Sequence, residues 1–451
     1  MNMLLLLVTF TLFIAFVLFQ TVYILVPLFK NEKKKRIPIN RQHSFSIIVP
    51  AYNEEKVIEN CIHGYLHQAH RDAELIIVND GSIDSTFDVL KELLDLHIYH
   101  RPGEDDGLIH KEVINVFRSS LHPSIYVLDK VNGGKADALN AGITFSRNEL
   151  VVTLDADSIL GEDALVEMNA AFQDHRVIAC GGNVLISQAF SGEIGNLKPT
   201  FTIPNVIRYQ FLQYLTAFLL HKRAQAAVGA ITVIAGAFGT FRRETLFHIQ
   251  GFRSTIGEDM DITLKLHRWI EENGRSSRIA FVPSAVCYTE CPDTLKSMFK
   301  QRVRWQKAFI DCLIHYRSSY FTRFSWRFSL FFLVDQFIIG TLNAFTVIAA
   351  PVVFIFRHDG MTLFLLLGLT AVLLFMYQSI ITIYISRLHG IRFSKRDIIR
   401  ILCFLPVEIG VYRMINLVFV VYGTLSYFHQ PQSWDKFERT GTVGWKGVKR
   451  A

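Results

Sequence analysis

Cysteine and charged residues are scarce in this sequence of 451 residues. The six cysteines form no Cys-x-x-Cys pair and have no regular spacing, so we expect reduced, structural thiols and no disulfide framework. Charged residues make up 19% of the chain and hydrophobic residues 50%. This balance excludes a disordered chain and is more apolar than that of a typical soluble enzyme.

Signatures of several common enzyme classes are also absent. The sequence contains no His-Glu-x-x-His, no Gly-x-Ser-x-Gly and no dinucleotide-binding glycine fingerprint. Residues 129–136 do not form a Walker A loop, because Asp129 stands at its first glycine position and Ala136 follows the lysine. Two interpretations of this segment are possible. A Gly-Gly turn could present Lys135 to a diphosphate, or the segment could be an ordinary turn with an exposed lysine.

Basic residues are in slight excess, since 47 Lys and Arg against 40 Asp and Glu give a formal net charge of +7. The excess lies in short runs beside apolar segments and is not spread along one face. This placement favours contact with a membrane surface and argues against a nucleic-acid partner.

The first long apolar run, residues 3–29, exceeds the roughly 20 residues that cross the hydrocarbon core of a bilayer. A secretory signal carries its basic residues before the apolar run, whereas here they follow it. They are Lys30, Lys33, Lys34, Lys35 and Arg36. We therefore predict an N-terminal transmembrane helix over 1–30, with the chain cytoplasmic from residue 30 onward.

Residues 43–323 show the pattern of a folded α/β domain. Short β-branched runs at 45–49, 75–78 and 151–154 alternate with helical patterns. Further on, apolar segments predict a C-terminal bundle over 328–428 with about three to four membrane segments, followed by a basic tail at 429–451.

The last apolar segment, residues 398–428, raises a question of topology. A single pass would place the basic tail outside, which opposes the positive-inside rule. One resolution is a re-entrant or two-legged hairpin that bends near Pro406 and Gly410. We favour a cytoplasmic tail.

Three acidic clusters, at Asp80, at Asp155 and Asp157, and at Glu258 and Asp259, follow strand-like runs. We therefore expect each at the carboxyl end of a strand, where open α/β sheets bind ligands. Asp80 lies in such a position, although an ordinary turn explains its segment as well. Asp155 and Asp157 can both point at one ligand and suit Mg²⁺ or Mn²⁺, with phosphate oxygens and water as further ligands. A lone Asp-x-Asp is more often a solvated turn.

Two further groups have competing explanations. Glu258 and Asp259 precede a helical pattern, and an acidic helix N-terminus is the simpler explanation of them alone. Gln301, Arg304 and Trp305 share one face of a predicted helix. A basic helix lying on the membrane would produce the same pattern.

As an ordered set ahead of apolar helices, these motifs resemble those of processive, membrane-embedded inverting glycosyltransferases of family 2. That family includes cellulose, chitin, hyaluronan and poly-N-acetylglucosamine synthases. The resemblance spans about residues 45–310 and continues into the C-terminal part by architecture only. The matching residues are 49–55, Asp80, Gly134, Lys135, 155–157, 236–239, Glu258, Asp259, Gln301, Arg304 and Trp305.

The resemblance implies a GT-A type fold, a Rossmann-like α/β domain with a mixed sheet. This cytoplasmic glycosyltransferase domain, residues 43–323 with interfacial helices, would be inserted between transmembrane helices. The protein would be a multi-pass protein of the plasma membrane. Its expected partners are a UDP-sugar donor, a growing glycan acceptor, the lipid bilayer, and accessory export or regulatory subunits.

The resemblance also assigns roles to individual residues. The implied substrate-binding residues are Pro50, Ala51, Tyr52, Glu54, Asp80, Lys135, Asp155, Ala156, Gly236, Ala237, Phe238, Glu258, Gln301, Arg304 and Trp305. Asp155, Asp157 and Asp259 would be the catalytic residues. Asp157 would bind Mg²⁺ or Mn²⁺, and Asp259 would be the general base that deprotonates the acceptor hydroxyl.

The implied reaction converts an α-linked UDP-sugar into a β-linked polysaccharide that crosses the membrane. N-acetylglucosamine is favoured as the donor sugar by resemblance alone, and glucose or two alternating sugars stay open. The alternative is non-processive transfer of one sugar to a membrane lipid. We find no C-terminal soluble domain and no arginine motif for a cyclic dinucleotide, which argues against direct second-messenger control.

Four polar residues interrupt the apolar C-terminal segments, namely Asp335, Gln336, Glu408 and Arg413. Such groups are costly in lipid and should face a protein or water-filled interior. They could line a glycan channel. Alternatively, Asp335 is interfacial and Glu408 pairs with Arg413.

Overall fold

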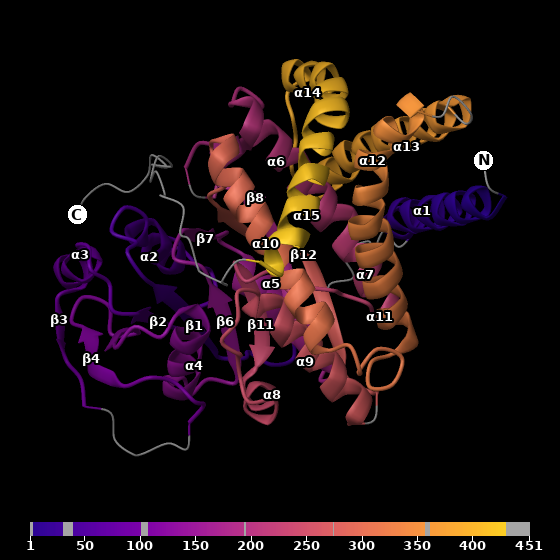
Figure 1. The fold of residues 1–451 in the computed structure, drawn as a ribbon. Helices are drawn as coiled ribbons and strands as arrows, with labels where there is room; N and C mark the ends of the chain where they lie inside the picture. Colours follow the sequence, from indigo (N-terminus) through magenta and orange to yellow (C-terminus); the bar gives the residue numbers. More distant parts are fainter. Residues whose placement is uncertain are drawn as a thin grey trace. The chain divides into compact units, whose positions relative to one another are not determined.

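The computed structural model describes residues 3–29, 39–100, 107–193, 195–273, 275–356 and 361–429 (Figure 1). The chain forms two compact units. The sheet unit comprises Lys34–Lys198 and Val233–Cys291, and the helical unit comprises Met1–Lys33, Pro199–Thr232 and Pro292–Asp435. Residues 199–232 and 292–323, which the sequence analysis places in the α/β domain, thus group with the apolar helices.

The sheet unit is built on a mixed sheet of ten strands, in the order β3-β4-β5-β2-β1-β6-β11-β8-β12-β7. Its strands are β1 (Phe45–Ala51), β2 (Ala73–Asn79), β3 (Leu96–Ile98), β4 (Val113–Ser119), β5 (Ile125–Lys130), β6 (Leu150–Leu154), β7 (Ser158–Leu160), β8 (Val177–Ile186), β11 (Phe238–Arg242) and β12 (Arg278–Thr289). The pairs β5/β2, β2/β1 and β1/β6 are parallel, whereas β11 runs antiparallel to β6 and β8. The predicted mixed α/β sheet is confirmed.

Continuous apolar runs form the central strands because both faces of the sheet are covered by other parts of the unit. All residues of β6 and β8 are buried. The helices of the unit are α2 (Ile58–Leu66), α3 (Thr86–Leu94), α4 (Lys135–Phe145), α5 (Ala164–Phe172), α8 (Arg243–His248) and α9 (Glu258–Glu272). A short 3₁₀ turn, η1 (Ser187–Ala189), leads into a small ladder of β9 (Phe190–Ser191) and β10 (Lys198–Pro199).

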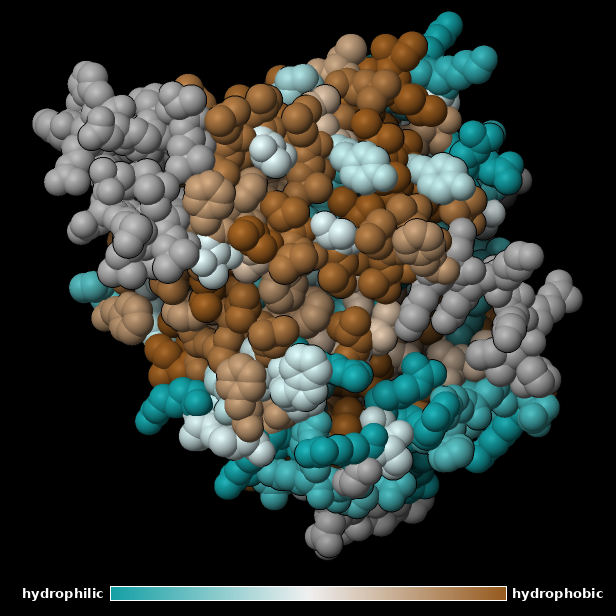
Figure 2. Space-filling model, turned by 90° about the vertical axis from the view of Figure 1, so that its right-hand side faces the viewer, coloured by the Kyte–Doolittle hydropathy of each residue, from teal (hydrophilic) through white to brown (hydrophobic). Residues whose placement is uncertain are grey.

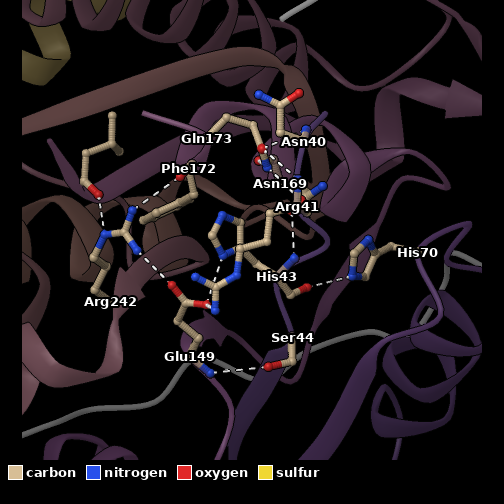
Figure 3. Close-up of polar contacts among 11 residues, drawn as sticks. Asn40, Arg41, His43, Ser44, His70, Glu149, Asn169, Phe172, Gln173 and Arg242 are labelled. Carbon is tan, nitrogen blue, oxygen red and sulfur yellow. Dashed lines mark hydrogen bonds and ion pairs between the residues drawn. The ribbon is translucent and has the colours of Figure 1, made fainter. Parts of the chain in front are cut away.

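A polar cluster anchors the segment that enters β1, at the amino ends of the parallel strands (Figure 3). His43 Nδ1 lies 3.0 Å from Glu149 Oε2, and the His43 amide donates to Asn169 Oδ1. Burial alone raises the pKa of Glu149, but the His43 hydrogen bond and the charges of Arg41 and Arg242 give a net decrease. The cluster ties the starts of β1 and β6 to α5.

Within the described residues, the helical unit contains four helical stretches long and apolar enough to cross a membrane, at Phe10–Phe29, Trp326–Ala349, Leu365–Leu388 and Lys395–Tyr427. Its elements are α1 (Met3–Phe29), α6 (Asn205–Thr216), η2 (Ala217–His221), α7 (Lys222–Val228), α10 (Leu295–His315), α11 (Trp326–Leu330), η3 (Phe331–Leu342), α12 (Asn343–Phe356), α13 (Met361–Leu388), α14 (Lys395–Val407), η4 (Glu408–Tyr412) and α15 (Arg413–Tyr427). Large apolar side chains such as Leu18, Leu369 and Val418 are exposed. Figure 2 shows apolar side chains gathered over one face. Such a face is typical of lipid contact.

The last apolar segment does not form the hairpin offered in the sequence analysis. Residues 395–427 are one continuous helical stretch, in which the π-helical turn η4 separates α14 from α15. Pro406 lies two residues before this turn, and the helical stretch continues past it. Pro406 therefore does not reverse the chain. The tail from residue 430 lies outside the described residues.

The polar residues of the apolar segments are paired in the interior of the helical unit. Tyr23 donates a hydrogen bond to Asp335, and Gln336 Nε2 also donates to that carboxylate. Arg413 Nε donates to Glu408 Oε1 at 2.8 Å. Asp335 is 6% exposed and therefore buried within the protein, and the alternative pairing of Glu408 with Arg413 is present.

Candidate active site

The parallel strands bring three segments to one edge of the sheet. Ala51 pairs with Asn79, which fixes Tyr52 and Asp80 as the next residues at this edge. The Asp80 amide also donates to the Ala51 carbonyl at 2.9 Å. On the other side of β1, β6 ends at Leu154 and places Asp155 at the same edge. Polar side chains far apart in the sequence therefore converge at the carboxyl ends of the strands.

Lys135 is the centre of a compact charged group at this edge. It begins α4, and its Nζ lies 2.6 Å from Asp155 Oδ1 and 2.9 Å from Glu258 Oε1. Burial alone lowers the pKa of Lys135, but the two carboxylates more than offset that effect and raise it. Lys135 is therefore a permanent cation between the segment after β6 and the start of α9.

Asp259 lies beside this group, at the start of α9. The expectation that its acidic cluster follows a strand was wrong, because α8 and a turn separate β11 from α9. Its Oδ1 accepts a hydrogen bond from the Met260 amide at 2.8 Å, and its Oδ2 accepts from the Gly236 amide at 3.4 Å. A Cβ atom at Gly236 would lie 3.0 Å from Lys135 Nζ and 3.4 Å from Asp259 Cβ. Glycine at 236 thus keeps the space beside Lys135 and Asp259 clear.

The environment of Asp259 shifts the pKa of its carboxyl group toward neutral pH. Burial and the neighbouring Glu258 carboxylate raise the pKa of Asp259 to about 6, although Lys135 and the two backbone amides oppose the shift. A carboxyl group with such a pKa is a competent general base at physiological pH, because it is deprotonated yet still accepts a proton readily.

Asp157 is held in a more enclosed position. It is 8% exposed, and the hydroxyls of Ser158 and Thr289 each lie 3.3 Å from Asp157 Oδ1. Thr289 ends β12, so its approach to Asp157 depends on the antiparallel pairing of β12 with β7. Thr289 carries no motif of its own, so no sequence pattern points to it.

Carboxylates gather around this part of the edge. The pKa of the buried Cys61 thiol is raised by burial and further by Asp157, Asp155 and Glu54. All three carboxylates therefore lie close enough to Cys61 to disfavour its thiolate form. Among the residues that the structure describes, no three His, Cys, Asp or Glu residues form a complete metal-binding group. A divalent ion here would take most of its ligands from a bound phosphate and from water.

The segment after β1 combines buried and exposed residues. Ala51 is buried, Pro50 is partly buried, and Glu54 is 6% exposed with its amide donating to Thr86 Oγ1. The Tyr52 side chain is 37% exposed. Tyr52 can therefore meet a ligand at the surface, whereas Ala51 and Glu54 shape the layer below it.

Asp80 is embedded in the adjoining turn. It is 2% exposed, and its carboxylate accepts the amides of Gly133 at 2.9 Å and Gly134 at 2.8 Å. The fully buried Lys130 ammonium lies 2.7 Å from Asp80 Oδ1. Lys130 was not identified from the sequence; its only signal there is a lysine at the end of an apolar strand.

The remaining residues predicted in the sheet unit have distinct surroundings. Ala156 is 2% exposed, next to both aspartates of the Asp-x-Asp pair. Ala237 presents its carbonyl to the Cys287 thiol. Phe238 is fully buried, and a Cβ at Gly182 would lie 2.1 Å from its ring, so the Phe238 side chain belongs to the core. Contact between Phe238 and a substrate would come from its backbone.

Gln301, Arg304 and Trp305 lie on α10, in the helical unit. Gln301 is buried, Arg304 is partly buried, and Trp305 is 39% exposed. The Arg302 guanidinium stacks over the Trp305 ring at 4.2 Å, so one face of the indole is already covered.

Comparison with known proteins identifies the family. Residues 42–308 match the family described as Glycosyltransferase like family 2. The poly-beta-1,6-N-acetyl-D-glucosamine synthase of Staphylococcus aureus (strain COL) is 28% identical over 320 residues, which cover 70% of this chain and 66% of that protein. The match therefore spans just under two thirds of that relative's length. The synthase of the same name from Staphylococcus epidermidis is 26% identical over 388 residues, covering 83% of this chain and 82% of that protein.

A solved structure supports the fold independently. The mannosyltransferase PcManGT from Pyrobaculum calidifontis, in complex with GDP-Man and Mn²⁺, has a TM-score of 0.52 and 15% identity. The similarity covers 93% of this chain and 99% of that one. The family match extends over more than half of the chain and includes every strand of the ten-stranded sheet. The chain belongs to glycosyltransferase family 2.

Proposed function

We propose that this protein is an inverting, processive glycosyltransferase that polymerises N-acetylglucosamine from a UDP-sugar into a β-1,6-linked glycan at a membrane. The observation that carries the proposal is the group formed by Lys135, Asp155, Glu258 and Asp259. It places a cation and a carboxyl group with a pKa of about 6 side by side at the ligand-binding edge of the sheet. The named activity of the two staphylococcal relatives supports the choice of sugar and linkage.

The donor nucleotide would bind at the carboxyl ends of β1 and β2. Pro50, Ala51, Tyr52 and Glu54 would line the nucleoside pocket, with Asp80 supporting its floor. Lys135 would then meet the diphosphate, and its positive charge would offset negative charge there. The exposed Tyr52 side chain is suited to stacking against a flat base.

The carboxylates near Lys135 also suit a divalent cation. Asp157, with Asp155 beside it, would hold Mg²⁺ or Mn²⁺ at the donor phosphates. Their carboxylate oxygens are suitable ligands for a hard cation. Their negative charges also raise the pKa of Cys61, which shows that negative charge is concentrated here. When bound, such an ion neutralises charge on the departing diphosphate.

Asp259 would be the general base for the acceptor. It accepts the proton of the acceptor hydroxyl as that oxygen attacks the anomeric carbon from the face opposite the diphosphate. A single displacement of this kind inverts the anomeric configuration, so an α-linked donor yields a β-linked product. One base at the acceptor side is sufficient, because the leaving diphosphate needs no second carboxylic acid.

The helical unit would hold and export the product. Gln301, Arg304 and Trp305 on α10 would bind the acceptor end of the glycan, with Trp305 stacking on a sugar ring. The four apolar helices would place the protein in the plasma membrane as a multi-pass protein, with the sheet unit in the cytoplasm. Accessory export or regulatory subunits are further expected partners.

Product analysis tests this proposal against transfer of one sugar to a membrane lipid. Purified protein in nanodiscs receives radiolabelled UDP-N-acetylglucosamine with Mg²⁺ or Mn²⁺, and parallel reactions receive UDP-glucose or a chelator. We expect a high-molecular-weight product that a β-1,6-N-acetylglucosaminidase degrades, and no product with the chelator. Label confined to lipid would replace the proposal with single transfer, and polymer from UDP-glucose alone would change the donor.

A further inference from the structure

The buried Lys130 side chain joins two segments of the candidate donor site. Lys130 ends β5 and is completely buried. Its Nζ lies 2.7 Å from Asp80 Oδ1, 2.6 Å from Asp137 Oδ1 and 2.6 Å from the Val131 carbonyl. The ammonium donates hydrogen bonds to Asp80 Oδ1 and the Val131 carbonyl, whereas Asp137 is its ion-pair partner.

The partners of Lys130 belong to different elements. Asp80 follows β2, whereas Asp137 lies in the first turn of α4, two residues after Lys135. Asp80 in turn accepts the amides of Gly133 and Gly134, and Asn132 Nδ2 donates to the Asp80 carbonyl at 2.7 Å. Lys130 and Asp80 together therefore determine the path of the Gly-Gly turn that leads into α4.

The turn leaves little room for another arrangement. Gly134 has φ of +89°, and a Cβ atom at Gly133 would lie 2.3 Å from Asp137 Oδ1. Gly81 has φ of +67°, and a Cβ atom there would lie 3.0 Å from the Asn132 amide nitrogen. Both turns thus need glycine, and the ion pairs of Lys130 hold the two turns in a fixed position relative to each other.

A buried charge is costly unless every donor is paired, and its contribution to net stability is small even then. An apolar residue would fill the end of β5 more cheaply. The benefit of lysine here is geometric, since it aligns Asp80 with the start of α4 and hence with Lys135. Lys135 then reaches Asp155 and Glu258.

We infer that Lys130 is a positioning residue of the donor site: through Asp80 and Asp137 it holds the Gly133–Gly134 turn so that Lys135 meets the diphosphate of a nucleoside-diphosphate donor. The inference rests on the proposed function. Lys130 itself is fully buried and acts through its neighbours.

Nucleotide affinity tests the inference. Lys130→Met keeps the length of the side chain and removes its charge, and Lys91→Met, an exposed lysine on α3, is the matched control. Binding of UDP is measured by calorimetry on the full-length protein in nanodiscs. We expect Lys130→Met to weaken UDP binding about tenfold and to raise KM for the UDP-sugar similarly, with kcat within about threefold and Lys91→Met unchanged.

Two outcomes would overturn the inference. One is UDP affinity within about twofold of the wild type in a folded Lys130→Met protein, and the other is a loss confined to kcat. If Lys130→Met does not fold, Asp137→Asn is the deciding variant. It keeps the ion pair between Lys130 and Asp80 but removes the ion pair that joins Lys130 to α4. There we expect about threefold weaker UDP binding, and unchanged affinity would contradict the role.

The proposed function can fail separately. Wild-type protein that binds UDP but makes no polymer would refute the polymerase, while the comparison of UDP affinities still decides the role of Lys130.

Discussion

The carboxyl group of Asp259 lies in a setting that raises its affinity for a proton. Burial removes water from the carboxylate, and the nearby negative charge of Glu258 further disfavours ionisation. Lys135 limits the shift, because its positive charge favours the ionised form of Asp259. Glu258 and Lys135, which belong to the candidate donor site, therefore also set the pKa of the base.

The pH dependence of the reaction should report this ionisation. Because the pKa of Asp259 is raised from 3.8 to about 6, the base form is lost as pH falls through about 6. We expect kcat/KM for the acceptor to decrease about tenfold per pH unit below that value and to level off above it. Initial rates at saturating UDP-sugar between about pH 5 and 8 measure this, and a flat profile would contradict it.

Replacement of the carboxyl group tests the same role at constant pH. Asp259→Asn keeps the size of the side chain and removes the proton acceptor, so we expect polymer synthesis to fall by about 10²- to 10⁴-fold. UDP binding should stay within a few fold, since Asp259 is not expected to contact the nucleotide. Glu272→Gln, an exposed carboxylate at the end of the same helix, is the control. Synthesis retained in Asp259→Asn would remove Asp259 from the base role.

Among elements, α4 connects the two halves of the candidate site. Lys135 is its first residue, and Asn140 lies further along the same helix. Asn140 Oδ1 accepts the Phe252 amide at 2.8 Å, and its Nδ2 donates to the carbonyls of Phe252 and Ile109. Asn140 thereby clamps the turn that precedes α9, the helix that carries Glu258 and Asp259.

Loss of this clamp should affect both stability and catalysis. Asn140→Leu has a similar shape but leaves buried backbone groups without partners, so we expect a loss of about 2–4 kcal/mol in the free energy of unfolding. We also expect kcat to fall more than UDP affinity, because α9 is freed while Lys135 stays in place. Unfolding of the purified protein and steady-state kinetics check this, with Asn115→Leu on the exposed face of β4 as control. Equal losses in both variants would show that the contacts of Asn140 are unimportant.

Sequence patterns are sufficient to predict some of the secondary-structure elements but not all of them. The strands that carry Asp80 and Asp155 follow from apolar runs, because a strand buried on both faces needs apolar residues throughout. The reversal near Pro406, offered as one resolution of the topology, was wrong, since residues 395–427 form one continuous helical stretch. Local sequence does not distinguish these two responses to proline.

At the scale of the whole molecule, both the sheet unit and the helical unit contain buried ion pairs. In the helical unit, the Glu408 side chain is 3% exposed and pairs with Arg413, whose guanidinium also lies 4.0 Å from the Phe375 ring centre. The pair links η4 to α15 across the π-helical turn, and the cation–π contact adds α13.

Breaking this pair should destabilise the helical unit. Arg413→Leu leaves the Glu408 charge buried without its partner, so we expect a loss of about 3–5 kcal/mol in the free energy of unfolding. The double variant Glu408→Gln with Arg413→Leu should recover much of that loss, since no charge remains uncompensated. Thermal unfolding in nanodiscs measures both. Additive losses in the double variant would show that the two residues act independently.

The sequence by itself determined the strand and helix patterns, the apolar segments and the acidic motifs, because each depends on residues close together in the chain. It also carried the resemblance to family 2 glycosyltransferases, which the comparison confirmed. The roles of individual residues at the site stay predictions until the variants are measured.

Only the tertiary structure decided which charges meet. The pairing of Lys135 with Asp155 and Glu258, and of Lys130 with Asp80 and Asp137, depends on strand order, since these partners come from separate elements. The raised pKa of Asp259 likewise depends on burial and on neighbours brought together by folding. Electrostatic interactions depend on distance in space, and a sequence pattern records only distance along the chain.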